Sequence, residues 1–245
     1  MNRFFVKQEG IVEPLITITD PEDVKHITKS LRCQMGDHLE VSDGISFEYE
    51  IVLSTITSQF VEGEIVKKSP FQREPHTKVT MYQALPKQGK MEVIIQKSVE
   101  LGVFQIVPIL TEHTVVLDKG RFDKKIERWQ KVADEAVKQC RRGVIPNIAE
   151  VKKLDDILNE WNQNDCNLFF YENEKDQTLK QVLHGFEKRP ERIGILIGPE
   201  GGFSKAEVEK ILKAGAKSVT MGKTILRVET AATAALAMCM YELEL

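Results

Sequence analysis

The sequence predicts an α/β protein in which a small strand-rich N-terminal part precedes a larger part built on a parallel sheet. Two patterns support this prediction: strand-like segments dominate the first 70 or so residues, and strand-like and helical patterns alternate from Lys78 onward. The chain has 245 residues, which is enough for one or two domains whose cores need no disulfide bonds.

The N-terminal part is predicted to be a small β-barrel interrupted by one helix. Asp20 is a typical helix cap, Pro21 suits the first helical position, and the helix should end before Gly36. The pair Asp43-Gly44 is typical of a hairpin turn. The expected strands are Arg3 to Val6, Leu15 to Ile18, His38 to Val41, Phe47 to Leu53 and Phe60 to Val66.

A linker is expected at Lys67 to Pro75, because this segment is polar and contains two prolines. We therefore expect two domains, 1–72 and 73–245. In the second, helical patterns separate the strand candidates, which favours a parallel sheet with helices on both faces. These strands are Val79 to Ala84, Ile106 to Leu110, Val144 to Ile148, Leu168 to Tyr171, Ile193 to Ile197 and Ser218 to Met221.

A glycine-rich loop follows the strand that ends at Ile197. Gly198, Gly201 and Gly202 allow a ligand to approach the backbone closely, and Ser204 with Glu207 predicts a capping box at the start of a helix. Glu200 would repel a polyphosphate, so a ligand with an adenosine part and a positive charge suits the loop better. The alternative is a tight turn with a solvated Glu200 near the helix dipole.

A second strand, loop and helix follow at once, with the loop spanning residues 222–230. Because ligands bind at the carboxyl ends of parallel strands, the two loops can form two walls of one cleft. The helix after the second loop is rich in alanine. Its narrow surface can pack closely against a cofactor, a neighbouring helix or another subunit.

Basic residues near predicted strand ends are candidates for contacts with RNA phosphates. Lys87, Lys90 and Lys97 lie on or just before one helix, and Arg141 and Arg142 follow a basic helical segment from Lys119. The alternative is a set of solvated helix faces held by ion pairs, with Lys97 paired to Glu100.

The net charge of the chain is −3, and residues 1–72 carry seven Lys and Arg against twelve Asp and Glu. Any RNA contacts in this part, such as Arg3 and Arg32, must therefore be individually placed. The four cysteines lack metal-ligand spacing, so buried reduced thiols are expected, without disulfides or metal. No apolar run approaches the length of a membrane span, and a cytoplasmic protein is expected.

The two loop segments resemble those of the SPOUT methyltransferases, and within them the RsmE family. The resemblance extends over nearly the whole chain. It rests on 196–203 and 221–231, together with 1–6, 26–32 followed by Gly36-Asp37, and 97–103. It implies a PUA-like RNA-binding domain, a C-terminal trefoil knot, S-adenosylmethionine as cofactor and a homodimer. The implied reaction is methylation of a uridine N3 in 16S rRNA of the small ribosomal subunit, at position 1498 in the usual rRNA numbering.

The predicted cofactor-binding residues come from both loops: Leu196, Gly198, Glu200, Gly201, Met221, Gly222, Ile225, Leu226, Thr230 and Ala231. Arg227 and Glu229 are the catalytic candidates, with Arg227 stabilising the uracil anion as the N3 proton leaves. Arg227 could instead form an ion pair with Glu229 or Glu200. Two other functions stay open, a ribose 2′-O-methyltransferase of the same superfamily and a non-catalytic module that binds RNA or adenosine.

Overall fold

The computed structural model describes residues 3–87, 89–115 and 122–244, and the chain divides into two compact units. Unit 1 consists of Met1–Glu74 with Val137–Ile145, and unit 2 of Pro75–Ala136 with Pro146–Leu245. The helix α3 (Phe122–Cys140) therefore contributes its last residues to unit 1. Among the predicted basic residues, Lys119 and Arg121 lie outside the described residues.

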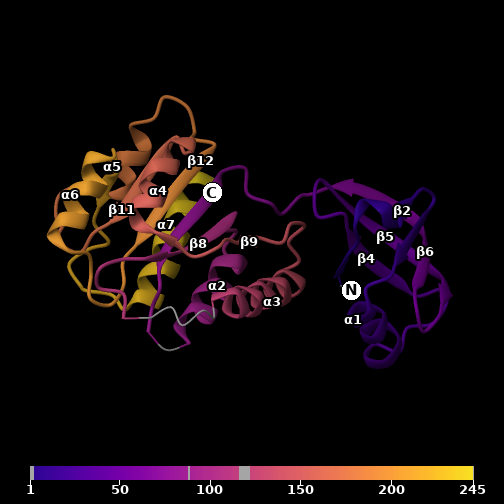
Figure 1. The fold of residues 1–245 in the computed structure, drawn as a ribbon. Helices are drawn as coiled ribbons and strands as arrows, with labels where there is room; N and C mark the ends of the chain where they lie inside the picture. Colours follow the sequence, from indigo (N-terminus) through magenta and orange to yellow (C-terminus); the bar gives the residue numbers. More distant parts are fainter. Residues whose placement is uncertain (1–2, 88, 116–121, 245) are drawn as a thin grey trace. The chain divides into compact units, whose positions relative to one another are not determined.

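Unit 1 is built on a curled sheet of six strands in the order β1-β4-β5-β6-β3-β2 (Figure 1). Only β1 and β4 pair in parallel; the other neighbours are antiparallel. The strands are β1 (Arg3–Phe5), β2 (Ile11–Val12), β3 (Leu15–Ile18), β4 (His38–Ser42), β5 (Phe47–Ile56) and β6 (Val61–Pro70). All five strands predicted for this part are present.

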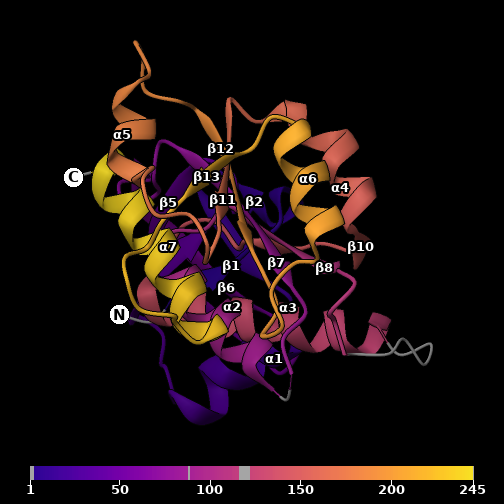
Figure 2. The ribbon, with the colours of Figure 1, turned by 90° about the vertical axis from the view of Figure 1, so that its left-hand side faces the viewer.

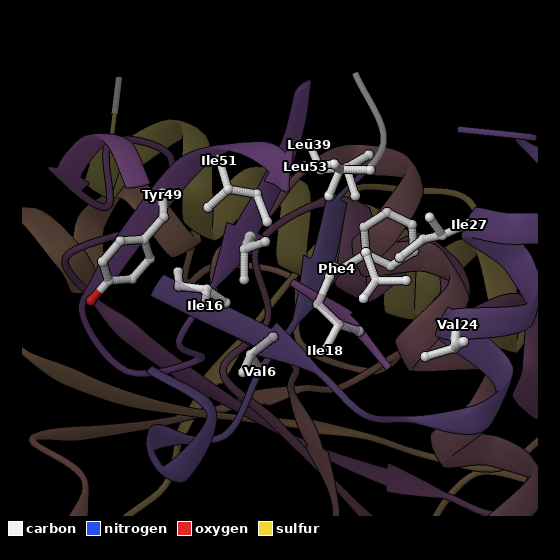
Figure 3. Packing of buried hydrophobic residues seen from close by; sticks show 12 residues of the cluster. Phe4, Val6, Ile16, Ile18, Val24, Ile27, Leu39, Tyr49, Ile51 and Leu53 are labelled. Atoms are coloured by element: carbon white, nitrogen blue, oxygen red, sulfur yellow. The ribbon is translucent and has the colours of Figure 1, made fainter. Parts of the chain in front are cut away.

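The core of unit 1 comes from alternate residues of these strands. Tyr49, Ile51 and Leu53 of β5 are buried while the residues between them are not, as expected for a strand with one face on the core. Figure 3 shows how they gather with Phe4 and with Ile27 of the helical segment.

The predicted helix and hairpin of unit 1 are confirmed. Asp20 accepts hydrogen bonds from two backbone N–H groups at the start of α1 (Pro21–Lys25), which continues into the π-helical turn η2 (His26–Ser30). Asp43 accepts backbone hydrogen bonds from Ile45, Ser46 and Phe47 in the β4–β5 turn. A short 3-10 turn, η1 (Gln8–Gly10), precedes β2.

Two expectations near the unit boundary were wrong in extent. Lys67 to Pro70 belong to β6 rather than to a linker, because they pair with the first four residues of β5. The strand expected from Val144 begins only at Asn147 as β9 (Asn147–Ile148). The reason is that the N–H groups of Gly143 and Val144 donate hydrogen bonds to the Glu74 carboxylate and therefore do not pair with another strand.

Unit 2 contains a parallel sheet in the order β10-β8-β7-β12-β11-β13, with β9 paired to β8. The predicted alternation of strands and helices is confirmed. The strands are β7 (Lys78–Ala84), β8 (Gln105–Leu110), β10 (Lys152–Lys153), β11 (Cys166–Phe170), β12 (Arg192–Ile197) and β13 (Lys217–Val219). The two-residue β10 was not predicted, because it is too short to show a periodic pattern.

Helices cover both faces of this sheet (Figure 2). α4 (Leu154–Glu160) and α6 (Lys205–Lys213) pack on one face, where Leu154, Ile157 and Ile211 join the core formed with Phe169 and Leu196. α2 (Lys90–Glu100) and α7 (Val228–Glu244) pack together, and α7 contacts β12. The other helical segments are η3 (Trp161–Gln163) and α5 (Leu179–His184). The threading of the chain into a trefoil knot stays a prediction.

The buried positions of Cys166 and Cys239 agree with the expectation of buried thiols, and burial raises the pKa of Cys166 to about 11. Cys33 and Cys140 are half-buried. No helix in the described ranges is both long and apolar enough to cross a membrane.

Candidate cofactor and RNA site

The first glycine loop leaves the sheet at the carboxyl end of β12 and enters α6. Ser204 caps α6, and its side chain and that of Glu207 form the predicted capping box. Glu207 also accepts a hydrogen bond from the backbone N–H of Glu112, 2.8 Å away, which ties the segment after β8 to this helix start. The backbone at Gly202 has φ +66°, a left-handed conformation that favours glycine.

The second loop follows β13 and enters α7. Gly222 has φ +108°, so the loop turns there as only glycine readily allows. The N–H groups of Ile225 and Leu226 have no hydrogen-bond partner within the described residues. They are therefore available to a ligand.

The two loops form walls of one cavity of about 300 Å³, as predicted. β12 and β13 are not neighbours, because β11 lies between them. The carboxyl end of β11 accordingly adds Phe170, Tyr171 and Glu172 to the lining. These residues were missed by sequence reasoning, although the strand Leu168 to Tyr171 was predicted; its place between the other two strands depends on sheet order.

Most of the predicted cofactor-binding residues are brought together here. The cavity is lined by Gly198, Glu200, Gly201, Met221, Gly222, Ile225, Leu226 and Ala231. Two predicted residues do not line the cavity. Leu196 is 1% exposed and lies in the core shared with α4 and α6, and Thr230 is exposed on the first turn of α7. Leu196 points away because successive strand residues face opposite sides of a sheet.

Side chains at Gly198 or Gly201 would crowd neighbouring residues of the site. A Cβ at Gly198 would lie 2.8 Å from the ring of Phe203, which packs edge-on against Phe169. A Cβ at Gly201 would lie 3.1 Å from Cβ of His113. His113 Nδ1 donates to the carbonyls of Gly201 and Gly202, 2.9 and 3.1 Å away, so the segment after β8 also braces the loop.

The charged centre beside the cavity is formed by Lys90, Glu200 and Glu229. The Lys90 ammonium lies 3.1 Å from Glu200 Oε1 and 3.2 Å from Glu229 Oε2. Hydrogen bonding to Glu200 is the main reason that the pKa of Lys90 is raised. The expected phosphate contact by Lys90 is therefore not supported, because its ammonium is already engaged by two carboxylates.

Both carboxylates are stabilised in their ionised form. Burial raises the pKa of Glu200, but hydrogen bonds from its own backbone N–H, from Lys90 and from the N–H of Lys87 lower it overall. The pKa of Glu229 is lowered by its own backbone N–H first, then by Lys90 and Arg227. Arg227 itself is exposed and forms no ion pair within the described residues, so the alternative of an Arg227 ion pair is not observed.

The predicted RNA contacts separate into two groups. Arg3 and Arg142 are 4% and 5% exposed; Arg3 pairs with Glu40 and Glu48, and Arg142 pairs with Glu74 at 2.7 Å. This burial contradicts their expected role as direct phosphate contacts, because both guanidinium groups are buried and paired with carboxylates of unit 1. Lys97 pairs with Glu100, as the alternative interpretation allowed.

Lys87, Arg32 and Arg141 form the second group: exposed cations with no side-chain partner among the described residues. Arg32 and Arg141 have φ of +55° and +58° and are the only non-glycine residues with positive φ in the part of the chain that the structure describes. Such backbone strain commonly marks functional positions. No cluster of three or more potential metal ligands occurs among the residues described.

Comparison with known proteins gives one consistent result. Residues 72–240 match the RNA methyltransferase domain family, and residues 18–66 match the PUA domain of RNA methyltransferases. Ribosomal RNA small subunit methyltransferase E of Bacillus subtilis is 32% identical over 252 residues, covering 100% of this chain and 98% of that protein.

Two solved structures match this chain along nearly their whole length. The structure of ribosomal RNA small subunit methyltransferase E from Neisseria gonorrhoeae bound to S-adenosyl methionine has a TM-score of 0.84 and 27% identity, covering 98% of this chain and 97% of that one. A Legionella pneumophila methyltransferase in complex with the bound cofactor SAM has the same TM-score at 29% identity, covering 98% and 96%.

Proposed function

Because this chain belongs to the RNA methyltransferase family that includes ribosomal RNA small subunit methyltransferase E, we propose that it methylates N3 of one uridine in 16S rRNA of the small ribosomal subunit. S-adenosylmethionine is the methyl donor. The observation that carries the proposal is the single cavity enclosed by the two glycine loops and the end of β11. Its volume of about 300 Å³ lies at the lower end of the usual range for small-molecule sites.

The residues of the cavity fit this cofactor. Glycines at 198, 201 and 222 permit close approach of the adenosine part. The N–H groups of Ile225 and Leu226, which have no partner among the described residues, can bind its polar edge. When bound, S-adenosylmethionine supplies a methyl group already activated by its positively charged sulfur. The protein then needs to hold the uridine in line with that methyl group.

The reaction also requires the N3 proton to leave as the new N–C bond forms and the C–S bond breaks. We propose that Arg227 stabilises the negative charge that develops on the uracil, because this exposed side chain forms no ion pair with any residue that the structure describes. We propose that Glu229, which lies two residues further along the chain, accepts the N3 proton. Its lowered pKa keeps it ionised at neutral pH but makes it a weak base, so proton transfer to it depends on Arg227 stabilising the uracil anion.

RNA recognition is proposed to involve both domains, with the boundary near residue 72. Arg32 and Arg141 in unit 1 and Lys87 in unit 2 are the proposed phosphate contacts, because they are exposed and form no ion pair within the described part of the chain. Each such contact contributes roughly one unit to the slope of log affinity against log salt concentration. A ribosomal substrate would place the enzyme in the cytoplasm.

A homodimer is also proposed. The outer side of α7 presents Ala234, Ala237 and Met238, which are half-buried, next to Tyr241, which is 66% exposed. Small residues beside an exposed ring suit close packing against a second copy. Sedimentation should then give twice the chain mass of 27.9 kDa, and a fully active monomer would contradict this.

The reaction is tested by incubating the protein with small ribosomal subunits that lack the modification and with labelled S-adenosylmethionine. The RNA is digested to nucleosides and analysed by mass spectrometry. We expect 3-methyluridine. A 2′-O-methylated nucleoside would instead support the ribose methyltransferase, and cofactor binding without any product would support a non-catalytic module.

A further inference from the structure

Lys90 is the one side chain among the described residues that forms ion pairs both with the first loop, at Glu200, and with the helix turn that ends the second loop, at Glu229. We propose that Lys90 is a positioning residue that holds the two loops at the separation the cofactor requires. This inference rests on the proposed binding of S-adenosylmethionine. It gives Lys90 a role different from the phosphate contact predicted from the sequence.

The three charged groups come from three separate elements. Lys90 opens α2, Glu200 lies in the loop after β12, and Glu229 lies on the first turn of α7. The Lys90 ammonium is 3.1 Å from one carboxylate and 3.2 Å from the other, and its side chain is 32% exposed. A partly shielded cation between two anions binds each more strongly than a fully solvated one does.

The two loops have no direct polar link. Among the described residues, no hydrogen bond or ion pair joins residues 198–204 to residues 221–229. Glu200 is also held by the N–H of Lys87, at 3.1 and 3.3 Å. Glu229 Oε2, in contrast, is buried without a hydrogen bond, and the ion pair with Lys90 is its remaining polar contact.

Removal of the Lys90 charge would therefore leave the carboxylates of Glu200 and Glu229 close together with no cation between them. Their repulsion would push the loops apart and widen the cavity that both loops line. Lowering the pH would relieve the repulsion, because one proton shared between the carboxylates replaces the lost positive charge. The expected signature is a cofactor affinity that depends more strongly on pH in the variant than in the wild type.

Other charged groups near the trio are the same in both proteins. They are Arg227, which acts on Glu229, and Lys87, His113 and Glu172, which lie beside Glu200, Gly201 and Gly202. Comparison of variant and wild type at each pH therefore removes their contribution.

The experiment is calorimetric titration of the full-length protein with S-adenosylmethionine from about pH 5.5 to pH 8.5. We expect Lys90→Met to bind about tenfold more weakly at pH 8 and to regain most of this loss at pH 5.5. Lys90→Arg should stay within about threefold of wild type, because a guanidinium can contact both carboxylates. The double variant Lys90→Met with Glu229→Gln should recover affinity at pH 8, since the repulsion is then absent.

The matched control is Lys210→Met. Lys210 forms a more exposed ion pair of 2.8 Å with Asp155, which does not line the cavity, so its loss removes one lysine charge and should leave cofactor affinity unchanged. Circular dichroism verifies folding of each variant. If Lys90→Met does not fold, the comparison of wild type with Lys90→Arg and Glu229→Gln still applies.

Two results would overturn the inference. One is a folded Lys90→Met protein with wild-type affinity at every pH, and the other is a loss that neither low pH nor Glu229→Gln reverses. If Lys90→Met does not fold, a Lys90→Arg protein that binds S-adenosylmethionine more than about tenfold more weakly than wild type would do the same. A wild-type protein that does not bind S-adenosylmethionine would refute the proposed function itself, which separates the two failures.

Discussion

Arg142→Ala should destabilise unit 1 rather than act on RNA binding alone. The Arg142 side chain is 6% exposed and pairs with Glu74 at 2.7 Å, with a further hydrogen bond from Nε to the same carboxylate. The carbonyl of Arg142 also accepts a hydrogen bond from the buried Arg3, 3.1 Å away. Loss of the side chain leaves the Glu74 carboxylate without its counter-charge.

The magnitude follows from what Glu74 retains. Breaking a buried ion pair by removing one partner typically costs about 3–5 kcal/mol. Glu74 is 18% exposed and keeps the N–H groups of Gly143 and Val144, at 2.8 and 3.2 Å, which offset part of that cost. We therefore expect a loss of about 2–3 kcal/mol. For a chain of this length that lowers the melting temperature by roughly 5–10 °C.

Arg141→Ala is the matched control, because the neighbouring side chain is exposed. It should leave the melting temperature nearly unchanged and weaken RNA binding, with a salt slope lower by roughly one unit. Thermal unfolding followed by circular dichroism and RNA binding at several salt concentrations measure both effects. An Arg142→Ala protein as stable as wild type that has lost only RNA affinity would refute this reasoning.

Three further outcomes are expected. Gly201→Val should weaken S-adenosylmethionine binding at least about tenfold, since even a Cβ there meets His113 at 3.1 Å; calorimetry that shows unchanged affinity would contradict it. Arg227→Ala should slow single-turnover methylation about a hundredfold and leave cofactor affinity within about twofold of wild type, because the contact of Arg227 with the developing charge forms in the transition state. An equal loss of rate and of cofactor affinity would show that Arg227 acts in binding instead. Glu244 has a pKa lowered to about 2: burial raises it, but hydrogen bonds from the Thr77 N–H, Arg189 and His76 outweigh burial. Its stabilisation is therefore present above about pH 4.5 and lost as the pH falls toward 2, so Glu244→Gln should flatten the unfolding free energy in that window.

The local parts of this protein follow from the sequence. Strand alternation, the Asp20 cap, the Asp43 turn and the Ser204–Glu207 capping box depend on residues a few positions apart, and each is observed. The glycine loops are equally local, since a left-handed backbone or a missing Cβ is a property of one residue. For this reason both walls of the cavity were predictable.

The tertiary structure determines which side chains that are distant in the sequence contact one another. Sheet order placed the end of β11 between the two loops, and this added Phe170 to Glu172 to the cavity. The cations Arg142 and Lys90 were indistinguishable from exposed ones in the sequence, yet one is buried against Glu74 and the other lies between Glu200 and Glu229. A charge is paired or free according to which distant carboxylate the fold brings within about 4 Å, and no local pattern encodes that distance.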